Sequence, residues 1–161
     1  MKRAFSTVNT AMASTMKCVI ADAGLCSIVE RPIPSPVAGQ VLVKIHMTAL
    51  NRADTLQRVG KYPVPAGESD VMGLECVGEV ISPGAKFQEG QRVMSLLSAG
   101  GYGEFVAVDE RLLMPIPAEM SYAEAACIPE TWLTGALERC NVTLRPPPTR
   151  SFVGLTRHFG T

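Results

Sequence analysis

The stretch "GLECVGEV", residues 73–80, places a single carboxylate, Glu75, among apolar and small side chains. Val77 and Val80 are typical of a β-strand, and Gly78 between them indicates a bend or the close approach of another backbone. A buried ionised carboxylate is costly unless it shifts its pKa or finds a hydrogen-bond donor. The stretch therefore indicates a strand and raises the question of which group satisfies Glu75.

Short β-prone segments separated by glycine- and proline-rich loops lie on both sides of this stretch. Val41, Val43 and Ile45 alternate with more polar positions, which predicts a half-buried strand at the start of residues 41–50. Further extended segments are indicated at residues 16–21, 76–82, 92–97, 105–109 and 112–117. Six or seven short strands at this spacing predict a compact, mainly β, barrel-like domain.

Helix signals are few and most stand near the carboxyl end. Asn51 can cap a short helix, and Asp54 follows where its charge favours a helix amino end. The segment "SYAE", residues 121–124, matches a capping box. A helix is predicted to resume over residues 129–140, with a proline suited to its first turn.

Composition excludes several classes of function. The 161 residues suffice for one domain and hardly for two, and 47% of them are hydrophobic, so a substantial core is expected. The formal net charge is zero and no basic block is present, which argues against nucleic-acid binding. No apolar run approaches the roughly 20 residues that cross a bilayer, so we expect no membrane span.

The cysteines and the amino-terminal segment bear on the compartment. Five cysteines, none in a C-x-x-C pair, argue against a disulfide framework or a four-cysteine zinc lobe, and we expect mostly buried, reduced thiols. Residues 1–15 contain Lys2 and Arg3 and no acidic residue. This segment suits a mitochondrial transit sequence and equally a disordered extension before Met16. A cytoplasmic location is expected, with a mitochondrial one as the alternative.

Several motifs occur in an order that goes beyond a generic β-domain. Over residues 16–141 the chain resembles the amino-terminal catalytic domain of the medium-chain dehydrogenase/reductase superfamily, in particular the zinc-free quinone oxidoreductases of the p53-inducible type. The resemblance implies a GroES-like, partly open β-barrel, NADPH bound against a Rossmann domain, and hydride transfer to a quinone or another small conjugated carbonyl. It leaves a homodimer open. The motifs are "LNRAD" (50–54), "GLE" (73–75), "GGYGEFVAV" (100–108) and "IPETWLT" (128–134).

The family resemblance also bears on metal binding. Zinc alcohol dehydrogenases have Gly-His-Glu where this chain has Gly73-Leu74-Glu75, so the ligand histidine is missing. The only histidines are His46 and His158, and no cysteine stands at a metal-site interval from either. We therefore expect no metal site, and we expect Glu75 to be a buried structural carboxylate near the cleft, held by a backbone or side-chain donor.

The resemblance implies three site residues. Asn51 matches a position close to the nicotinamide and the acceptor, although it also reads as a plain helix cap. Tyr62 matches a phenol that donates a hydrogen bond to the acceptor carbonyl, with loop packing as the alternative. Thr134 matches a helix position that faces the nicotinamide. Asn51 and Tyr62 are thus the expected catalytic residues, and Asn51 and Thr134 the expected cofactor contacts.

Nearby residues are interpreted as structural. Trp132 is expected in the core, and Arg52 and Asp54 as a solvated charge pattern. The glycines of residues 100–103 form a flexible cluster that precedes a strand, which argues against phosphate binding.

No glycine-rich turn between a strand and a helix follows residue 141, so the Rossmann domain expected from the family is missing. The proline-rich residues 142–161 are interpreted as a disordered or aberrant tail. Three hypotheses remain: a quinone reductase relative cut short, a stand-alone GroES-like module that binds a partner, and a domain that binds small molecules without redox chemistry. On the first, the isolated chain is expected to be inactive.

Overall fold

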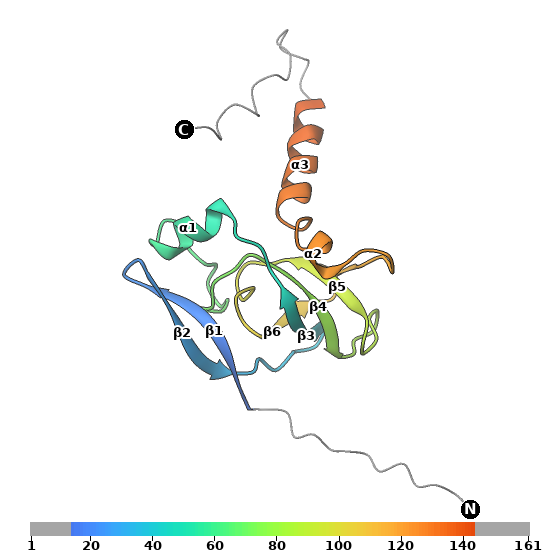
Figure 1. Cartoon of the computed structure of the whole chain (residues 1–161), viewed down its shortest axis with the longest axis horizontal. Coiled ribbons are helices and arrows are strands. Elements are labelled where there is room, and N and C mark those ends of the chain that lie inside the picture. The colour runs from blue at the N-terminus through green and yellow to red at the C-terminus, as the bar shows by residue number, and fades with distance from the viewer. Residues whose placement is uncertain (1–13, 144–161) are drawn as a thin grey trace, which may run out of the picture.

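The computed structural model describes residues 14–143, and its side chains as far as Arg139. These residues form seven strands and three short helices (Figure 1). The elements are β1 (Thr15–Asp22), β2 (Leu25–Pro32), β3 (Gln40–Met47), α1 (Arg52–Arg58), β4 (Glu75–Ser82), β5 (Arg92–Leu96), β6 (Phe105–Asp109), β7 (Met114–Pro115), α2 (Tyr122–Ala125) and α3 (Thr131–Thr143). The predicted mainly β domain is confirmed. The interpretations of the two terminal segments fall almost wholly outside the described residues.

The strands form two open sheets rather than a closed barrel. β1 and β2 pair as a hairpin, and the other strands form a five-stranded sheet in the order β6-β3-β4-β5-β7. Every strand pair is antiparallel, so residues 14–143 contain no parallel Rossmann sheet. The described part of the chain also has no helix long and apolar enough to cross a membrane.

The sequence reading assigned no element to residues 25–32, which form β2. The hairpin turns through Ala23 and Gly24, whose φ angles of 47° and 84° suit a tight turn between twisted strands. Most β2 side chains are exposed, so this strand has no clear alternation of buried and exposed positions. That absence explains why periodicity alone did not identify it.

A hydrophobic core cluster is formed mainly by side chains from the strands of the five-stranded sheet. Val41 and Val43 of β3 are fully buried and pack with Val80, Val93 and Val106 of the neighbouring strands. Ile45 is partly buried against the same cluster, so the predicted inner face is confirmed. Leu42, on the opposite face, is also buried, which shows that the first half of β3 is covered on both sides.

Two glycine positions are fixed by close backbone approach. A Cβ atom at Gly78 would lie 2.0 Å from the carbonyl oxygen of Lys44, so the predicted close approach at this position is confirmed. A Cβ atom at Gly101 would lie 2.3 Å from the carbonyl oxygen of Glu75, and the Gly101 amide donates to Gly73 O at 3.0 Å. The expectation of a flexible glycine cluster at 100–103 was wrong, because this segment packs against the start of β4.

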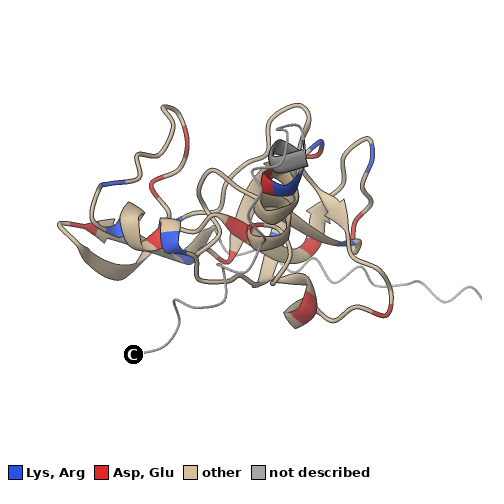
Figure 2. Ribbon diagram, turned by 90° about the horizontal axis from the view of Figure 1, so that it is seen from above, with Lys and Arg blue, Asp and Glu red and all other residues tan. Residues whose placement is uncertain are grey.

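The helices lie at one end of the sheets, and α3 extends away from the body of the molecule (Figure 1). Trp132 is 71% exposed and Leu137 is 65% exposed, so the expectation that Trp132 belongs to the core was wrong. The physical reason is that α3 extends away from the sheets from its start, so its side chains have little of the described chain to pack against (Figure 1). Acidic and basic residues are interspersed over the loops and helices, as Figure 2 shows.

Candidate functional site

Glu75 stands at the centre of a buried polar link between three segments. Its side chain is at the start of β4 and the residue is only 1% exposed. Oε1 accepts a hydrogen bond from the Asn51 side-chain amide at 2.6 Å. Oε2 accepts one from the backbone amide of Glu130 at 3.2 Å. A side-chain donor and a backbone donor therefore both satisfy the carboxylate, as the sequence predicted.

The loop that carries Asn51 is held on the same residues. The Thr48 hydroxyl donates to the carbonyl oxygen of Glu75 at 2.8 Å. Asp54 Oδ2 accepts from the Asn51 backbone amide at 2.7 Å, which completes the amino end of α1. Gln57 Oε1 accepts a longer bond from the Gly73 amide at 3.4 Å. These contacts fix α1 against the segment that leads into β4.

Carboxylates gather around this link. Burial raises the pKa of Glu130, and the nearby charges of Glu75 and Asp54 raise it further. Asp54 is only 3% exposed, so its interpretation as part of a solvated charge pattern was wrong. The capping position on α1 turns its side chain inward, whereas Arg52 remains exposed.

The residues implied by the family resemblance occupy different environments. Asn51 lies in the polar link, beside the residue that precedes α3. Tyr62 is 42% exposed in the loop after α1. Thr134 is exposed in the first turn of α3, where its amide donates to Glu130 O at 3.1 Å. No hydrogen bond between described residues joins Tyr62 or Thr134 to Asn51.

Tyr102 is a candidate that the sequence reading missed. A Cβ atom at Gly73 would lie 2.5 Å from Tyr102 Cδ1, which shows that the ring packs directly over this glycine. The hydroxyl donates to Ala49 O over a long 3.4 Å. Burial raises the pKa of Tyr102, and the neighbouring Asp54 raises it further. The only sequence signal was its place in "GGYGEFVAV", a motif used for fold recognition rather than for chemistry.

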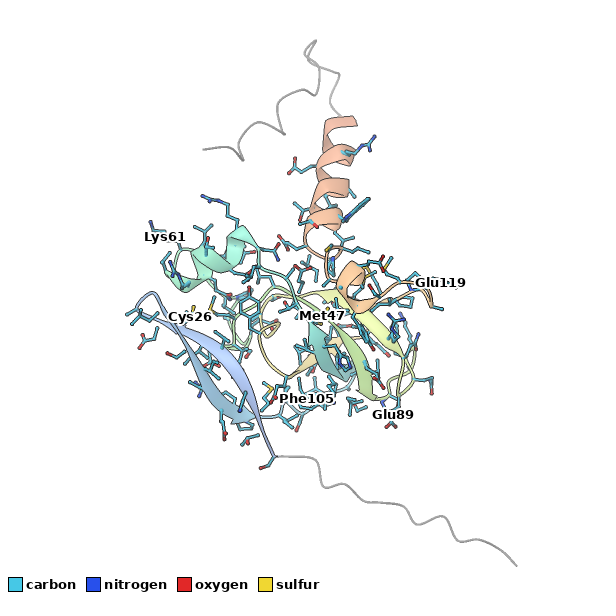
Figure 3. The ribbon with its side chains drawn as sticks, viewed as in Figure 1. Cys26, Met47, Lys61, Glu89, Phe105 and Glu119 are labelled. Carbon is cyan, nitrogen blue, oxygen red and sulfur yellow. The ribbon has the colours of Figure 1, made fainter. Side chains whose placement is uncertain are left out.

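Two adjoining hollows share the Tyr102 wall. One, of about 660 Å³, has apolar walls that include Ile45 and Met47 of β3. The other, of about 460 Å³, lies beside α1 and includes Asp54. Cys26, Leu50 and Tyr102 line both. Cys26 lies at the end of the hairpin below α1 (Figure 3). These hollows, rather than a separate one beside the Arg31–Asp70 ion pair, adjoin the polar link.

The described residues give no candidate metal centre. They contain no cluster of three or more His, Cys, Asp or Glu side chains suited to a metal ion. Leu74, which stands where zinc alcohol dehydrogenases have a ligand histidine, is 3% exposed. His46 instead lies 3.7 Å from a Glu79 carboxylate oxygen and stacks on Tyr122 at 4.8 Å between ring centroids.

The four cysteines whose side chains the structure describes divide into two classes. Cys18 and Cys76 are buried, whereas Cys26 and Cys127 are exposed and free. The expectation of mostly buried thiols is therefore wrong for these last two, which lie at a hairpin end and a helix end. Burial raises the pKa of Cys76 to about 12.

Comparison with known proteins points to an oxidoreductase domain. The family model described as "Alcohol dehydrogenase GroES-like domain" matches residues 37–118. The trans-enoyl reductase FMN2 of Fusarium mangiferae is 35% identical over an alignment that covers 70% of this chain and 31% of that protein. The mitochondrial NAD(P)H oxidoreductase RTN4IP1 of Dictyostelium discoideum is 32% identical, with coverage of 65% and 33%.

Solved structures show the same likeness. The quinone oxidoreductase of Thermus thermophilus, also solved in complex with NADPH, superposes with a TM-score of 0.68 at 32% identity. The superposition covers 81% of this chain and 42% of that one. The chain spans about a third of the length of each of the two curated relatives named above.

Proposed function

Because the chain belongs to the alcohol dehydrogenase GroES-like domain family, with quinone oxidoreductases and enoyl reductases of the medium-chain dehydrogenase/reductase superfamily among its relatives, we propose that it supplies the acceptor side of such a reductase. The reaction is NADPH-dependent and zinc-independent hydride transfer to a quinone or another small conjugated carbonyl. NADPH, when bound, supplies the hydride. The preference for NADPH over NADH is proposed from the family alone.

The observation that carries the proposal is the link from Asn51 through Glu75 to Glu130. It holds the loop after β3, the start of β4 and the start of α3 together through bonds of 2.6 and 3.2 Å. One amide hydrogen of Asn51 is used in this link, which leaves its second amide hydrogen for a ligand. In the proposal, Asn51 and Thr134 contact the nicotinamide end of the cofactor.

Tyr62 has the proposed role of hydrogen-bond donor to the acceptor. A phenol stabilises the negative charge that develops on a carbonyl oxygen as hydride arrives at the conjugated system. Its 42% exposure on the loop after α1 leaves the hydroxyl accessible to a bound molecule. Tyr62 transfers no electrons, so in the complex with cofactor and acceptor this loop has only to orient the phenol.

The described residues fit only the nicotinamide end of the cofactor. Gly100, Gly101 and Gly103 precede β6 and pack against residues 73–75, so they form no phosphate cradle at a helix start. Binding energy from the diphosphate and adenosine normally orients the nicotinamide for hydride transfer. We therefore propose that a polypeptide of these 161 residues has no quinone reductase turnover of its own.

NADPH oxidation by the purified 161-residue polypeptide, with duroquinone as acceptor, tests the proposed absence of turnover. We expect the buffer rate, and no saturable quenching or enhancement of NADPH fluorescence. Saturable turnover that is lost in Tyr62→Phe or Asn51→Ala would contradict it, and would reveal a complete cofactor site in this chain.

A second candidate function is a GroES-like module that binds a partner or ligand without catalysis. The observation that favours it is the exposed apolar surface of α3, with Trp132 at 71% and Leu137 at 65% exposure. A second copy of the chain is one proposed partner for this surface. Size-exclusion chromatography with light scattering tests it: Trp132→Ser and Leu137→Ser together should leave a monomer if α3 forms a dimer.

We propose a cytoplasmic location, with the mitochondrion as the alternative because one relative is named as a mitochondrial protein. Imaging of the chain with and without residues 1–15, fused to a carboxyl-terminal fluorescent protein, distinguishes the two.

A further inference from the structure

The hollow of about 460 Å³ beside α1 contains a buried acceptor that is not satisfied by the protein. Asp54, which lines it, is 3% exposed. Its Oδ2 accepts from the Asn51 amide at 2.7 Å, but Oδ1 has no hydrogen-bond partner among the described residues. A buried polar atom in this state costs free energy that a donor from a ligand can recover.

Tyr102 presents a donor on the wall of the same hollow. Its backbone is fixed on both sides, because its amide donates to Met72 O at 2.8 Å and its carbonyl accepts from Val19 N at 3.0 Å. The hydroxyl donates a long 3.4 Å bond to Ala49 O, and it lies close enough to the Asp54 side chain to interact with it. Burial and the neighbouring Asp54 raise the pKa of the phenol, so it keeps its proton at neutral pH.

Asp54 and Tyr102 therefore offer one acceptor and one donor side by side. A ligand hydroxyl matches both, since it can donate to Asp54 Oδ1 and accept from the Tyr102 hydroxyl. A ligand carbonyl can only accept, and would leave Oδ1 unsatisfied. Leu50 and Met72 give the hollow apolar walls that suit an aromatic ring.

We propose that this hollow binds a phenolic hydroxyl between Asp54 and Tyr102. The natural ligand of this class is the hydroquinone form of the acceptor, an assignment that rests on the proposed function. Recognition of a phenol does not rest on it. The site thus distinguishes the reduced product, which carries hydroxyl groups, from the quinone, which carries only carbonyl oxygens.

The test uses the 161-residue chain without cofactor and two matched probes, 4-methoxyphenol and 1,4-dimethoxybenzene, of which only the first can donate a hydrogen bond. Isothermal titration calorimetry gives their affinities. We expect 4-methoxyphenol to bind at least about tenfold more tightly, the range for a hydrogen bond to a charged group. Occupancy should also slow iodoacetamide labelling of Cys26, which lines the hollow, and leave Cys127 unchanged as the internal control.

Two variants assign the preference to its residues. Asp54→Asn removes the charged acceptor and should reduce the preference to about twofold or less. Tyr102→Phe keeps the ring over Gly73 but removes a donor from which both probes can accept, so it should weaken the binding of both probes by a similar factor. This loss decides the matter if Asp54→Asn fails to fold by circular dichroism. Tyr122→Phe, a tyrosine outside the hollow that stacks on His46, should retain the full preference.

Equal affinity for the two probes in the unaltered chain would overturn the proposal, as would a full preference in a folded Asp54→Asn variant or unchanged affinity for both probes in Tyr102→Phe. Because no NADPH is present, absence of quinone turnover leaves this result intact. Conversely, absence of phenol binding leaves the proposed hydride transfer untouched.

Discussion

The Asn51 side chain and the Glu75 carboxylate are joined by a 2.6 Å hydrogen bond across 24 positions of sequence. The bond connects the residue that caps α1 to the first residue of β4. The other carboxylate oxygen accepts from the amide of Glu130. One buried side chain therefore positions the loop that carries Asn51 and the start of α3 together.

Replacing Glu75 should destabilise the domain strongly. Glu75→Ala leaves the Asn51 amide and the Glu130 amide without their acceptor, and we expect a loss of about 2–4 kcal/mol in the free energy of unfolding. Glu75→Gln keeps one acceptor but places an amide donor against one of the two donors, so about half of that loss is expected. Urea unfolding followed by circular dichroism measures both.

Glu89→Ala is the matched control, because Glu89 is exposed in the loop between β4 and β5. It should change the unfolding free energy by less than about 0.5 kcal/mol. A Glu75→Ala variant as stable as Glu89→Ala would show that the link does not hold the domain together.

Thiol reactivity should follow burial. At pH 8, iodoacetamide should label Cys26 and Cys127 in the native chain, since both are exposed. Cys76 is buried with its pKa raised to about 12, and burial also raises the pKa of Cys18, so these two should react only after denaturation. Peptide mass spectrometry assigns the sites. Rapid native labelling of Cys76 would contradict the packing of β4 against β5.

Glu130 should make stability fall as pH rises. Its pKa in the folded chain is raised above the ordinary 4.5, so the folded state binds this proton more tightly than the unfolded state. Stability from this group is present below about 4.5 and is lost as the pH rises through the raised pKa. Glu130→Gln should therefore be more stable than the unaltered chain at pH 7, and the difference should vanish near pH 4.

Glu124→Gln should change the stability in the opposite direction to Glu130→Gln. Hydrogen bonds from Ser121 lower the pKa of Glu124, so its stabilisation is present above its ordinary value and is lost as the pH falls. Glu124→Gln should be less stable than the unaltered chain at pH 7, with a smaller difference in acid. Urea midpoints at pH 4, 5.5 and 7 measure both series, and equal signs for the two variants would refute the assignment.

Zinc should be absent from the purified chain. The prediction rests on Leu74 in place of a ligand histidine and on the engagement of His46 with Glu79 and Tyr122. Elemental analysis of protein purified without chelators should give well under one zinc per chain. A stoichiometric amount would overturn the zinc-independent assignment.

Local sequence rules predicted those elements that carry their own signals. The alternation at residues 41–45 predicted β3, and the capping pattern Ser121 to Glu124 predicted α2, whose Glu124 amide donates to the Ser121 hydroxyl. β2 lacked a signal because its side chains are mostly exposed and its stability depends on pairing with β1.

The site was predicted in part. A lone carboxylate in an apolar strand indicated that Glu75 needed donors, but the donors come from residues 24 and 55 positions away. Burial of Asp54 and the placement of Tyr102 over Gly73 depend on long-range packing, which the spacing of residues in the sequence does not predict. The prediction for Trp132 failed because an apolar residue in a sequence indicates a contact surface but does not show that the same chain buries it.

A chimera tests most directly the central claim, that this domain supplies the acceptor side of a reductase that transfers hydride. Residues 16–139 would replace the corresponding segment of the Thermus thermophilus quinone oxidoreductase, whose structure matches 81% of this chain with a TM-score of 0.68. We predict a folded chimera that oxidises NADPH with duroquinone, and whose kcat falls at least about tenfold in Tyr62→Phe while Tyr122→Phe, a phenol stacked on His46, retains activity. A chimera that folds and binds NADPH but reduces no quinone or enone would contradict the assignment of this domain to hydride transfer.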